Sequence, residues 1–150
     1  MELPYFQQET KDTCAAASLR MALASIGINR SEKVLASLLK TNRKSGVRVE
    51  AFAPVAEKYK LRYVVGRNAT LADLEEILDR EYRVIVGYRH PGKDGHYSLV
   101  SKLTDKHIYL NDPNPYAGRN NRYSRDYFNR LWRRGLKYGK DTTWFIGLKK

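Results

Sequence analysis

Apolar residues recur every three or four positions through much of the first half of the chain, and in alternation or short runs through the second half. The first pattern predicts amphipathic helices, and the second predicts strands. Ser31, Thr70 and Ser124 each precede a helical pattern as candidate N-caps, and Gly27 ends the first helix. The predicted helices cover residues 14–26, 32–40, 49–60 with Pro54 as an irregularity, 71–80, and a stretch after Ser124. The predicted strands cover residues 61–65, 83–89, 96–103, 107–111 and 142–148, with a turn at 91–95.

Helices that come first and antiparallel strands that follow predict an α+β fold. The chain has 150 residues, of which 42% are apolar and 11% aromatic, so it can bury a sizeable core. It contains no internal repeat and no low-complexity tract. We therefore expect a single domain over residues 1–150.

Two of the predicted strands follow each other closely enough to form a hairpin. If its turn is residues 103–105, one register keeps the apolar side chains of both strands on one face. This register sets His96 opposite Asp112, so that an imidazole and a carboxylate lie side by side at the end of the pair. It favours His96, rather than His90 or His107, as the neighbour of Asp112.

The only cysteine, Cys14, lies in the first turn of the first predicted helix. Unpaired N–H groups give that end of a helix a partial positive charge, which favours the reactive thiolate over the thiol. The alternative is that Cys14 is a small buried apolar residue beside the alanines that follow it. A single cysteine excludes an intramolecular disulfide and a multi-cysteine zinc site, and it indicates a reducing compartment or a thiol kept for its reactivity.

A nucleophilic cysteine needs an imidazole that takes its proton and an acceptor that fixes the tautomer and orientation of that imidazole. His96 and Asp112 are the candidates for these two roles beside Cys14. The negative charge that develops on an attacked carbonyl needs a hydrogen-bond donor as well. Gln8, six positions before Cys14, can supply a side-chain N–H next to the backbone N–H of Cys14, and Gln7 is the alternative.

Several stretches of the chain together resemble one protein family. They are the segment from Leu3 to Gly27, with Gln8 and Cys14 before a helix of small residues, the Gly95–Val100 segment, and Asn111-Asp112-Pro113. The helix after Ser124 resembles the one that follows the Asp-Pro loop in that family. The family is that of the bacteriocin-processing cysteine peptidases and their stand-alone relatives, a branch of the papain-like fold.

The resemblance implies a papain-like α+β fold, in which a helical half carries Cys14 at a helix N-terminus and an antiparallel sheet carries His96 and Asp112. It implies Cys14 as nucleophile, His96 as general base and acid, Asp112 as orienting group and Gln8 as oxyanion donor. Members of the family cleave the peptide bond after a small-residue pair, often Gly-Gly, that ends the leader of a secreted peptide. The peptidase is commonly the cytoplasmic N-terminal domain of an ATP-driven exporter, so the expected partners are a peptide or protein substrate and a separate exporter.

Three other functions stay open beside proteolysis. The same thioester chemistry serves amide hydrolases and acyltransferases, and the same fold can bind a peptide without cutting it. The third is nucleic-acid binding, because the formal net charge is +12 and residues 117–150 alone, with ten basic and two acidic side chains, contribute +8. The side chains that would contact phosphates and bases are Arg119, Arg122, Arg125, Arg130, Arg133, Arg134 and Lys137, with Tyr123, Tyr127 and Trp132 among them.

The N-terminus has no basic region followed by an apolar run, and no stretch approaches the ~20 apolar residues of a membrane span. We therefore expect a cytoplasmic protein without a membrane span. The candidate residues imply neither a metal nor an organic cofactor.

Overall fold

The computed structural model describes residues 2–44, 46–91, 94–136 and 142–150. The helices are α1 (Cys14–Ala24), α2 (Glu32–Leu38), the 3-10 turn η1 (Val49–Ala51), α3 (Phe52–Lys58), α4 (Leu71–Asp79) and α5 (Arg125–Arg134). The strands are β1 (Arg62–Gly66), β2 (Arg83–Arg89), β3 (Gly95–Leu103), β4 (His107–Asp112), β5 (Gly118–Ser124) and β6 (Trp144–Lys149). The predicted α+β fold is confirmed. Gly92 and Lys93, in the predicted turn at 91–95, lie outside the described residues, as does Lys137.

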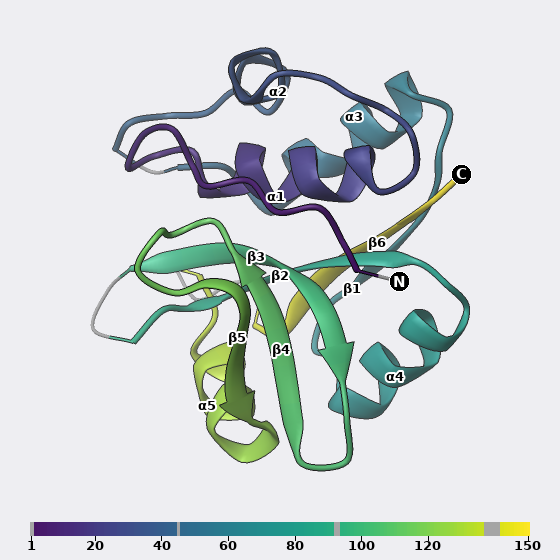
Figure 1. Ribbon diagram of the computed structural model, residues 1–150, viewed down its shortest axis with the longest axis vertical. Helices are drawn as coiled ribbons and strands as arrows, with labels where there is room; N and C mark the ends of the chain where they lie inside the picture. Colours follow the sequence, from purple (N-terminus) through teal and green to yellow (C-terminus); the bar gives the residue numbers. More distant parts are fainter. Residues whose placement is uncertain (1, 45, 92–93, 137–141) are drawn as a thin grey trace.

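The six strands form one antiparallel sheet in the order β1-β6-β2-β3-β4-β5. Helices α1, α2 and α3 cover one face of the sheet, and α4 and α5 lie on the other side of it (Figure 1). The N-terminal third thus forms a helical layer of its own. Its first helix packs on β3 and β2, which lie at the centre of the sheet.

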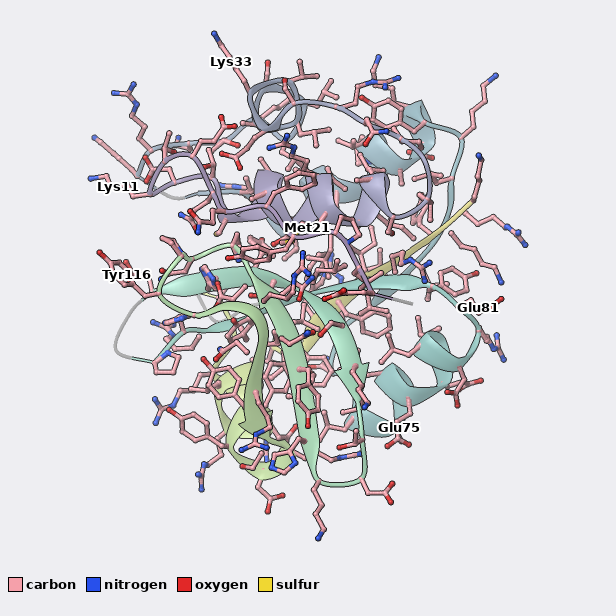
Figure 2. The ribbon with its side chains drawn as sticks, in the orientation of Figure 1. Lys11, Met21, Lys33, Glu75, Glu81 and Tyr116 are labelled. Atoms are coloured by element: carbon pink, nitrogen blue, oxygen red, sulfur yellow. The ribbon has the colours of Figure 1, made fainter. Side chains whose placement is uncertain are left out.

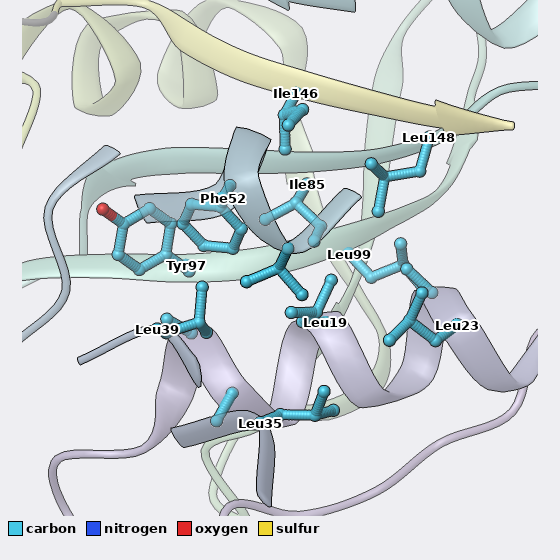
Figure 3. Close-up of a cluster of buried hydrophobic side chains, with 14 of the residues drawn as sticks. Leu19, Leu23, Leu35, Leu39, Phe52, Ile85, Tyr97, Leu99, Ile146 and Leu148 are labelled. Carbon is cyan, nitrogen blue, oxygen red and sulfur yellow. The ribbon is translucent and has the colours of Figure 1, made fainter. Parts of the chain in front are cut away.

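A large apolar core joins the helical layer to the sheet (Figure 3). Leu19 and Leu23 of α1 point toward the sheet, where they meet Ile85 and Leu99. Phe52 of α3 packs in the same core against aromatic rings of the sheet. Because α1 is buried along most of its length, the position of its first residue is firmly fixed.

A second core lies between the sheet and the other two helices. Phe128, Leu131 and Trp132 of α5 and Leu74 and Ile77 of α4 pack there against β2, β4 and β6. This packing excludes one of the aromatic residues considered above from a role in nucleic-acid binding. Trp132 is fully buried and its indole N–H donates to the carbonyl of Trp144, so it cannot stack on a base.

The predicted helix starts are confirmed by their caps. The hydroxyls of Ser31, Thr70 and Ser124 each accept a backbone N–H three residues ahead, and Thr70 forms a capping box with Asp73. The structure shows what happens at Pro54, where the sequence predicts an irregularity in the helix. A 3-10 turn precedes α3, and Pro54 lies in the first turn of α3, where its missing N–H costs no helical hydrogen bond.

The predicted hairpin register is wrong. Leu99 pairs with Asn111 and Val100 with Leu110, so the pairing is shifted by two residues, and a bulge between Val100 and Lys102 shifts it once more toward the turn. The hydroxyl oxygen of Ser101, the residue at this bulge, lies 3.1 Å from the carbonyl oxygen of Tyr109 and 2.7 Å from the side-chain oxygen of Asn120.

The stretch between the predicted strand 107–111 and Ser124, for which no element is predicted above, contains β5, an edge strand that pairs with β4. Two side chains of α5 depart from a simple division into a buried apolar face and an exposed basic face. Tyr127 is partly exposed, whereas Arg125 is partly buried and binds Glu75 and the carbonyl of Thr104.

Among the described residues, no helix is both long enough and apolar enough to cross a membrane.

Candidate active site

Cys14 is the first residue of α1. Its side chain is half-buried, and it is a free thiol. The first N–H groups of an α-helix have no partner within the helix, so those at the start of α1 are available to an anion beside the sulfur. The residue before it, Thr13, is the N-cap, yet its hydroxyl makes no capping bond to the helix.

His96 and Asp112 meet at one end of the sheet. His96 is the second residue of β3 and Asp112 the last of β4, and the Nε2 of His96 lies 2.6 Å from Oδ1 of Asp112. Both side chains are buried, Asp112 completely. The predicted pair therefore forms despite the wrong register. A shift of two residues keeps both side chains on the same face, because side chains alternate with a period of two along a strand.

The other nitrogen of His96 is left for the sulfur of Cys14. Burial opposes the charge on the ring, but the charge of Cys14 and the hydrogen bonds to Asp112 and Cys14 outweigh it and raise the pKa of His96 from 6.5 to about 10. A histidine placed next to a cysteine in this way can take the proton of the thiol.

The carboxylate of Asp112 is held by several groups besides His96. The hydroxyl of Tyr88 donates to Oδ2 at 3.3 Å and the backbone N–H of Asn114 donates to Oδ1 at 2.8 Å. The hydroxyl of Tyr5 donates to the main-chain oxygen of the same residue at 2.6 Å. Burial favours the neutral acid, but the contacts with His90 and His96 and the bond from Asn114 hold the pKa of Asp112 well below its usual range.

Gln8 lies between the loop that leads to Cys14 and the segment that follows Asp112. Its backbone N–H donates to the carbonyl of Pro113 at 2.9 Å, and its side-chain Nε2 donates to the carbonyl of Thr10 at 2.7 Å. The Oε1 of Gln8 is buried and has no hydrogen-bond partner among the described residues. Gln7, the alternative oxyanion donor, is exposed.

Glu32 is a neighbour of this loop that the sequence pattern does not reveal. It is the first residue of α2 and only 1% exposed, and its Oε2 accepts the backbone N–H of Glu9 at 2.6 Å and the hydroxyl of Thr13 at 2.8 Å. Burial raises the pKa of Glu32, although these two hydrogen bonds oppose the shift. An acidic residue in the first turn of a helix is ordinarily explained by the helix dipole. Nothing in the sequence therefore indicates that Glu32 contacts the loop before Cys14.

His90 is the second neighbour of the site, although the predicted register set it aside in favour of His96 as the neighbour of Asp112. Its Nε2 lies 3.4 Å from Oδ2 of Asp112, and its ring is 4.9 Å from the ring of His96 in an edge-on arrangement. Side chains two residues apart along a strand point to the same face, and Tyr88 pairs with His96. His90, two residues after Tyr88, is therefore expected on the same face as His96. Within the described ranges, His90, His96 and Asp112 are also the group whose donor atoms are close enough to hold a metal ion, all within 4.8 Å of one another.

A thiol at the start of a buried helix, next to a histidine and a carboxylate on an antiparallel sheet, is the arrangement of papain-like cysteine peptidases. The fold of the chain is of this class. Comparison with protein-family models then gives the family. Residues 1–139 match the Peptidase_C39 like family, so the chain belongs to that family and is a cysteine peptidase, a hydrolase.

Solved structures of similar fold cover nearly the whole chain. The peptidase domain of Streptococcus ComA, a bifunctional ABC transporter of a quorum-sensing pathway, matches with a TM-score of 0.79 and 24% identity over 99% of this chain and 97% of that one. A putative C39-like peptidase from Bacillus anthracis has a TM-score of 0.75 and 13% identity over 99% and 94%. A double-glycine motif protease of an AMS/PCAT transporter, in complex with the leader peptide, has a TM-score of 0.68 and 17% identity over 99% and 91%. No curated protein sequence matches the chain.

Proposed function

We propose that this cysteine peptidase uses Cys14 as its nucleophile, His96 as general base and acid, and Asp112 as the group that orients His96. The observation that carries the proposal is the buried His96–Asp112 hydrogen bond of 2.6 Å beside the thiol at the start of α1. Gln8 completes the proposed set as oxyanion donor, and residues 1–150 act as one peptidase domain.

In the first step the thiolate of Cys14 attacks the carbonyl carbon of the substrate. The oxygen gains a negative charge, which the N–H at the start of α1 and the side-chain N–H of Gln8 stabilise. The position of Gln8 supports this role, because its backbone is bonded to Pro113, next to Asp112, and its amide reaches the loop before Cys14.

In the second step His96 gives its proton to the leaving nitrogen, the C–N bond breaks, and a thioester forms on Cys14. A water molecule then attacks the thioester while His96 takes a proton from that water. When the carboxylic acid product is released, Cys14 is again a thiolate and His96 an imidazolium. Asp112 accepts the Nε2–H of His96 throughout, so the ring keeps its other nitrogen toward the sulfur.

The substrate we propose is a peptide with a Gly-Gly or similar small-residue pair at the end of a leader. The support comes from relatives of the same fold: one is described as a double-glycine motif protease bound to its leader peptide, and another is the peptidase domain of an ABC transporter. By the same comparison, a separate exporter is the partner we propose for the cleaved product.

The test is cleavage of synthetic peptides followed by mass spectrometry. The wild-type protein should cleave a synthetic peptide of about 30 residues after an internal Gly-Gly pair. A matched peptide with Val-Val in place of Gly-Gly should stay intact. Cys14→Ala should abolish cleavage while leaving the circular dichroism spectrum unchanged.

Other outcomes of this test would redirect the assignment. Cleavage that survives in Cys14→Ala would remove Cys14 as nucleophile. Binding of the Gly-Gly peptide without any cleavage by the wild-type protein would instead support a peptide-binding module on the same fold. Transfer of the acyl group to an added amine in preference to water would indicate an acyltransferase.

A further inference from the structure

The two side-chain oxygens of Asp112 are held unequally. Oδ1 has two short contacts, with Nε2 of His96 at 2.6 Å and with the backbone N–H of Asn114 at 2.8 Å. Oδ2 has two longer contacts, with the hydroxyl of Tyr88 at 3.3 Å and with Nε2 of His90 at 3.4 Å. A fully buried carboxylate is stabilised by hydrogen-bond donors at both of its oxygens. The groups that face Oδ2 therefore decide how firmly the carboxylate is held on that side.

Both ring nitrogens of His90 face oxygen atoms. Nδ1 lies 3.3 Å from the carbonyl oxygen of Pro91, and Nε2 lies 3.4 Å from the carboxylate oxygen of Asp112. A neutral imidazole has one N–H, and a hydrogen bond to a charged acceptor is about twice as strong as one to a neutral acceptor. The N–H is therefore best placed on Nε2. This nitrogen is buried and makes no hydrogen bond of ordinary geometry with the described residues, so a small turn of the ring is needed to align the N–H with Oδ2. Contacts in catalytic sites are commonly long before the substrate binds and tighten afterwards.

The charge of Asp112 supports the same direction of the hydrogen bond. The contact with His90 is the largest of those that lower the pKa of Asp112. A lone pair on Nε2 would repel the carboxylate and would act in the opposite direction. The position of His90 is also defined by its surroundings: its side chain is only 15% exposed, and its ring lies edge-on to that of His96, 4.9 Å away.

We propose that His90 is a positioning residue, which donates its Nε2–H to Oδ2 of Asp112 and so keeps the carboxylate turned with Oδ1 toward His96. Without His90, Oδ2 is left with the long bond from Tyr88, whose hydroxyl also contacts the hydroxyl of Ser98 at 2.9 Å. With both donors in place, a rotation of the carboxylate breaks contacts at each of its oxygens. The effect on catalysis rests on the function proposed above, whereas the hydrogen bond does not.

The consequence for the reaction lies in the orientation of His96. The Nε2–H of His96 is bonded to Oδ1, so a carboxylate that turns takes the ring with it and moves the other ring nitrogen away from Cys14. A reacting group that is misplaced by about 1 Å can cost about a hundredfold in rate. In this scheme His90 acts only through Asp112, and its loss should therefore lower the rate without abolishing the reaction.

The kinetic test compares two replacements of His90. Methionine has a similar length and no N–H, whereas the amide nitrogen of glutamine lies near the place of the ring Nε2 and keeps a donor there. His90→Met should lower kcat by about tenfold or more with little change in KM, and His90→Gln should lose clearly less. His107→Met, at the start of β4, is the matched control and should keep the wild-type kcat. Circular dichroism of each variant shows whether it is folded.

A second measurement needs no variant. In ¹H–¹⁵N spectra of the histidine rings of the wild-type protein, Nε2 of His90 should carry a proton, and a neutral ring with its proton on Nδ1 would overturn the proposal. The same spectra report on His96, whose Nε2–H lies in a bond of 2.6 Å and should resonate far downfield. His90→Met should move this resonance upfield more than His90→Gln does. Both variants lack the ring of His90, so the difference between them does not come from its ring current.

The two measurements separate this inference from the proposed function. The expected spectra together with no cleavage by the wild-type protein would leave the His90–Asp112 hydrogen bond standing and remove the peptidase proposal. Cleavage by the wild-type protein with an unchanged kcat in His90→Met would do the reverse. Equal losses of kcat in His90→Met and His90→Gln would show that the ring of His90 matters only for packing, and this result would also overturn the positioning role.

Discussion

Asp112 carries a buried charge, and among the described residues the basic side chains within ion-pair distance of it are His90 and His96 rather than a lysine or an arginine. Its two side-chain oxygens face His96, His90, Tyr88 and the N–H of Asn114, and these groups share the cost of burying the charge. A carboxylate held in this way stays ionised at neutral pH, as the lowered pKa of Asp112 indicates. At the scale of a residue, Asp112 therefore stabilises the protonated form of His96 and fixes its ring at the same time.

The first prediction concerns the alkaline limit of activity. His96 must be protonated to serve as the acid, and its pKa is raised to about 10, so kcat/KM of the wild-type protein should fall as the pH rises through about 10. Asp112→Asn removes one cause of the raised pKa, and its alkaline limit should move to lower pH, with kcat reduced by about 10²-fold or more. Asp105→Asn changes an exposed acid and should leave the profile unchanged. Identical profiles for the wild-type protein and Asp112→Asn would show that Asp112 does not act through His96.

The second prediction separates Gln8 from Gln7. If Gln8 stabilises the oxyanion, Gln8→Ala should lower kcat by about 10²–10³-fold with little change in KM, because the interaction exists only in the transition state. Gln7 is exposed, so Gln7→Ala should keep the wild-type kcat. Steady-state kinetics on the same peptide decide between them, and the reverse result would transfer the role to Gln7.

The sequence reveals the residues that carry chemistry better than the residues that support them. Cys14 stands out because it is the only cysteine, and the pairing of His96 with Asp112 survives a register error of two residues, which keeps both side chains on one face. Glu32 was missed and His90 was set aside for a physical reason. Their contacts with Glu9 and Asp112 join segments that are distant in sequence, and the sequence does not show which distant segments meet.

At the scale of an element, the loop of residues 9–13 is the link between the two ends of the candidate site. It joins Gln8 to Cys14 and has no secondary structure of its own, so contacts from outside must hold it. Glu32, at the start of α2, bonds to both ends of this loop, through the N–H of Glu9 and the hydroxyl of Thr13. Figure 2 labels Lys11 of this loop and Tyr116 of the loop after Asp112, and both project outward from the same side of the molecule.

The third prediction tests this contact. Glu32→Ala removes the acceptor of two hydrogen bonds and leaves the N–H of Glu9 and the hydroxyl of Thr13 without it, so the free energy of unfolding should fall by about 1–3 kcal/mol. Since a loop that shifts by a fraction of an ångström displaces the oxyanion donors, kcat should fall by about tenfold or more with KM less affected. Glu57→Ala on α3, an exposed position, is the matched control. A fall in stability with an unchanged kcat would limit Glu32 to a structural role.

The elements that sequence analysis missed are those without an apolar pattern. β5 consists mostly of arginine and asparagine and lies at the edge of the sheet, where one side of the strand has no partner strand. A polar edge strand of this kind has the composition of a loop. The register shifts in β3, between Val100 and Lys102, and in β4, between Leu110 and Asp112, also have no apolar pattern. Polar side chains make hydrogen bonds across the strands beside them: Ser101 contacts Asn120, and the side-chain oxygen of Asn111 accepts the N–H of Asn120.

At the scale of the whole molecule, the candidate site is built from both halves of the chain. Cys14 belongs to the helical layer and His96 and Asp112 to the sheet, so the site exists only when the core between the two layers is formed. Folding and the protonation of the site are therefore linked. Groups whose pKa values differ between the folded and unfolded chain make the stability depend on pH.

The fourth prediction follows from that linkage. The pKa of His96 is raised from 6.5 to about 10, so its contribution to stability is fully present below about pH 6.5 and is lost as the pH rises through about 10. The pKa of Asp112 is lowered, so its contribution is present above about pH 4 and is lost in stronger acid. Thermal unfolding should therefore show the largest difference in Tm between the wild-type protein and His96→Gln between about pH 4 and 6.5, of roughly 5 °C or more, with the two curves converging toward pH 10. His107→Gln replaces a histidine outside the site and should follow the wild-type curve throughout, whereas a constant difference between the wild-type protein and His96→Gln at every pH would mean that His96 contributes by packing alone.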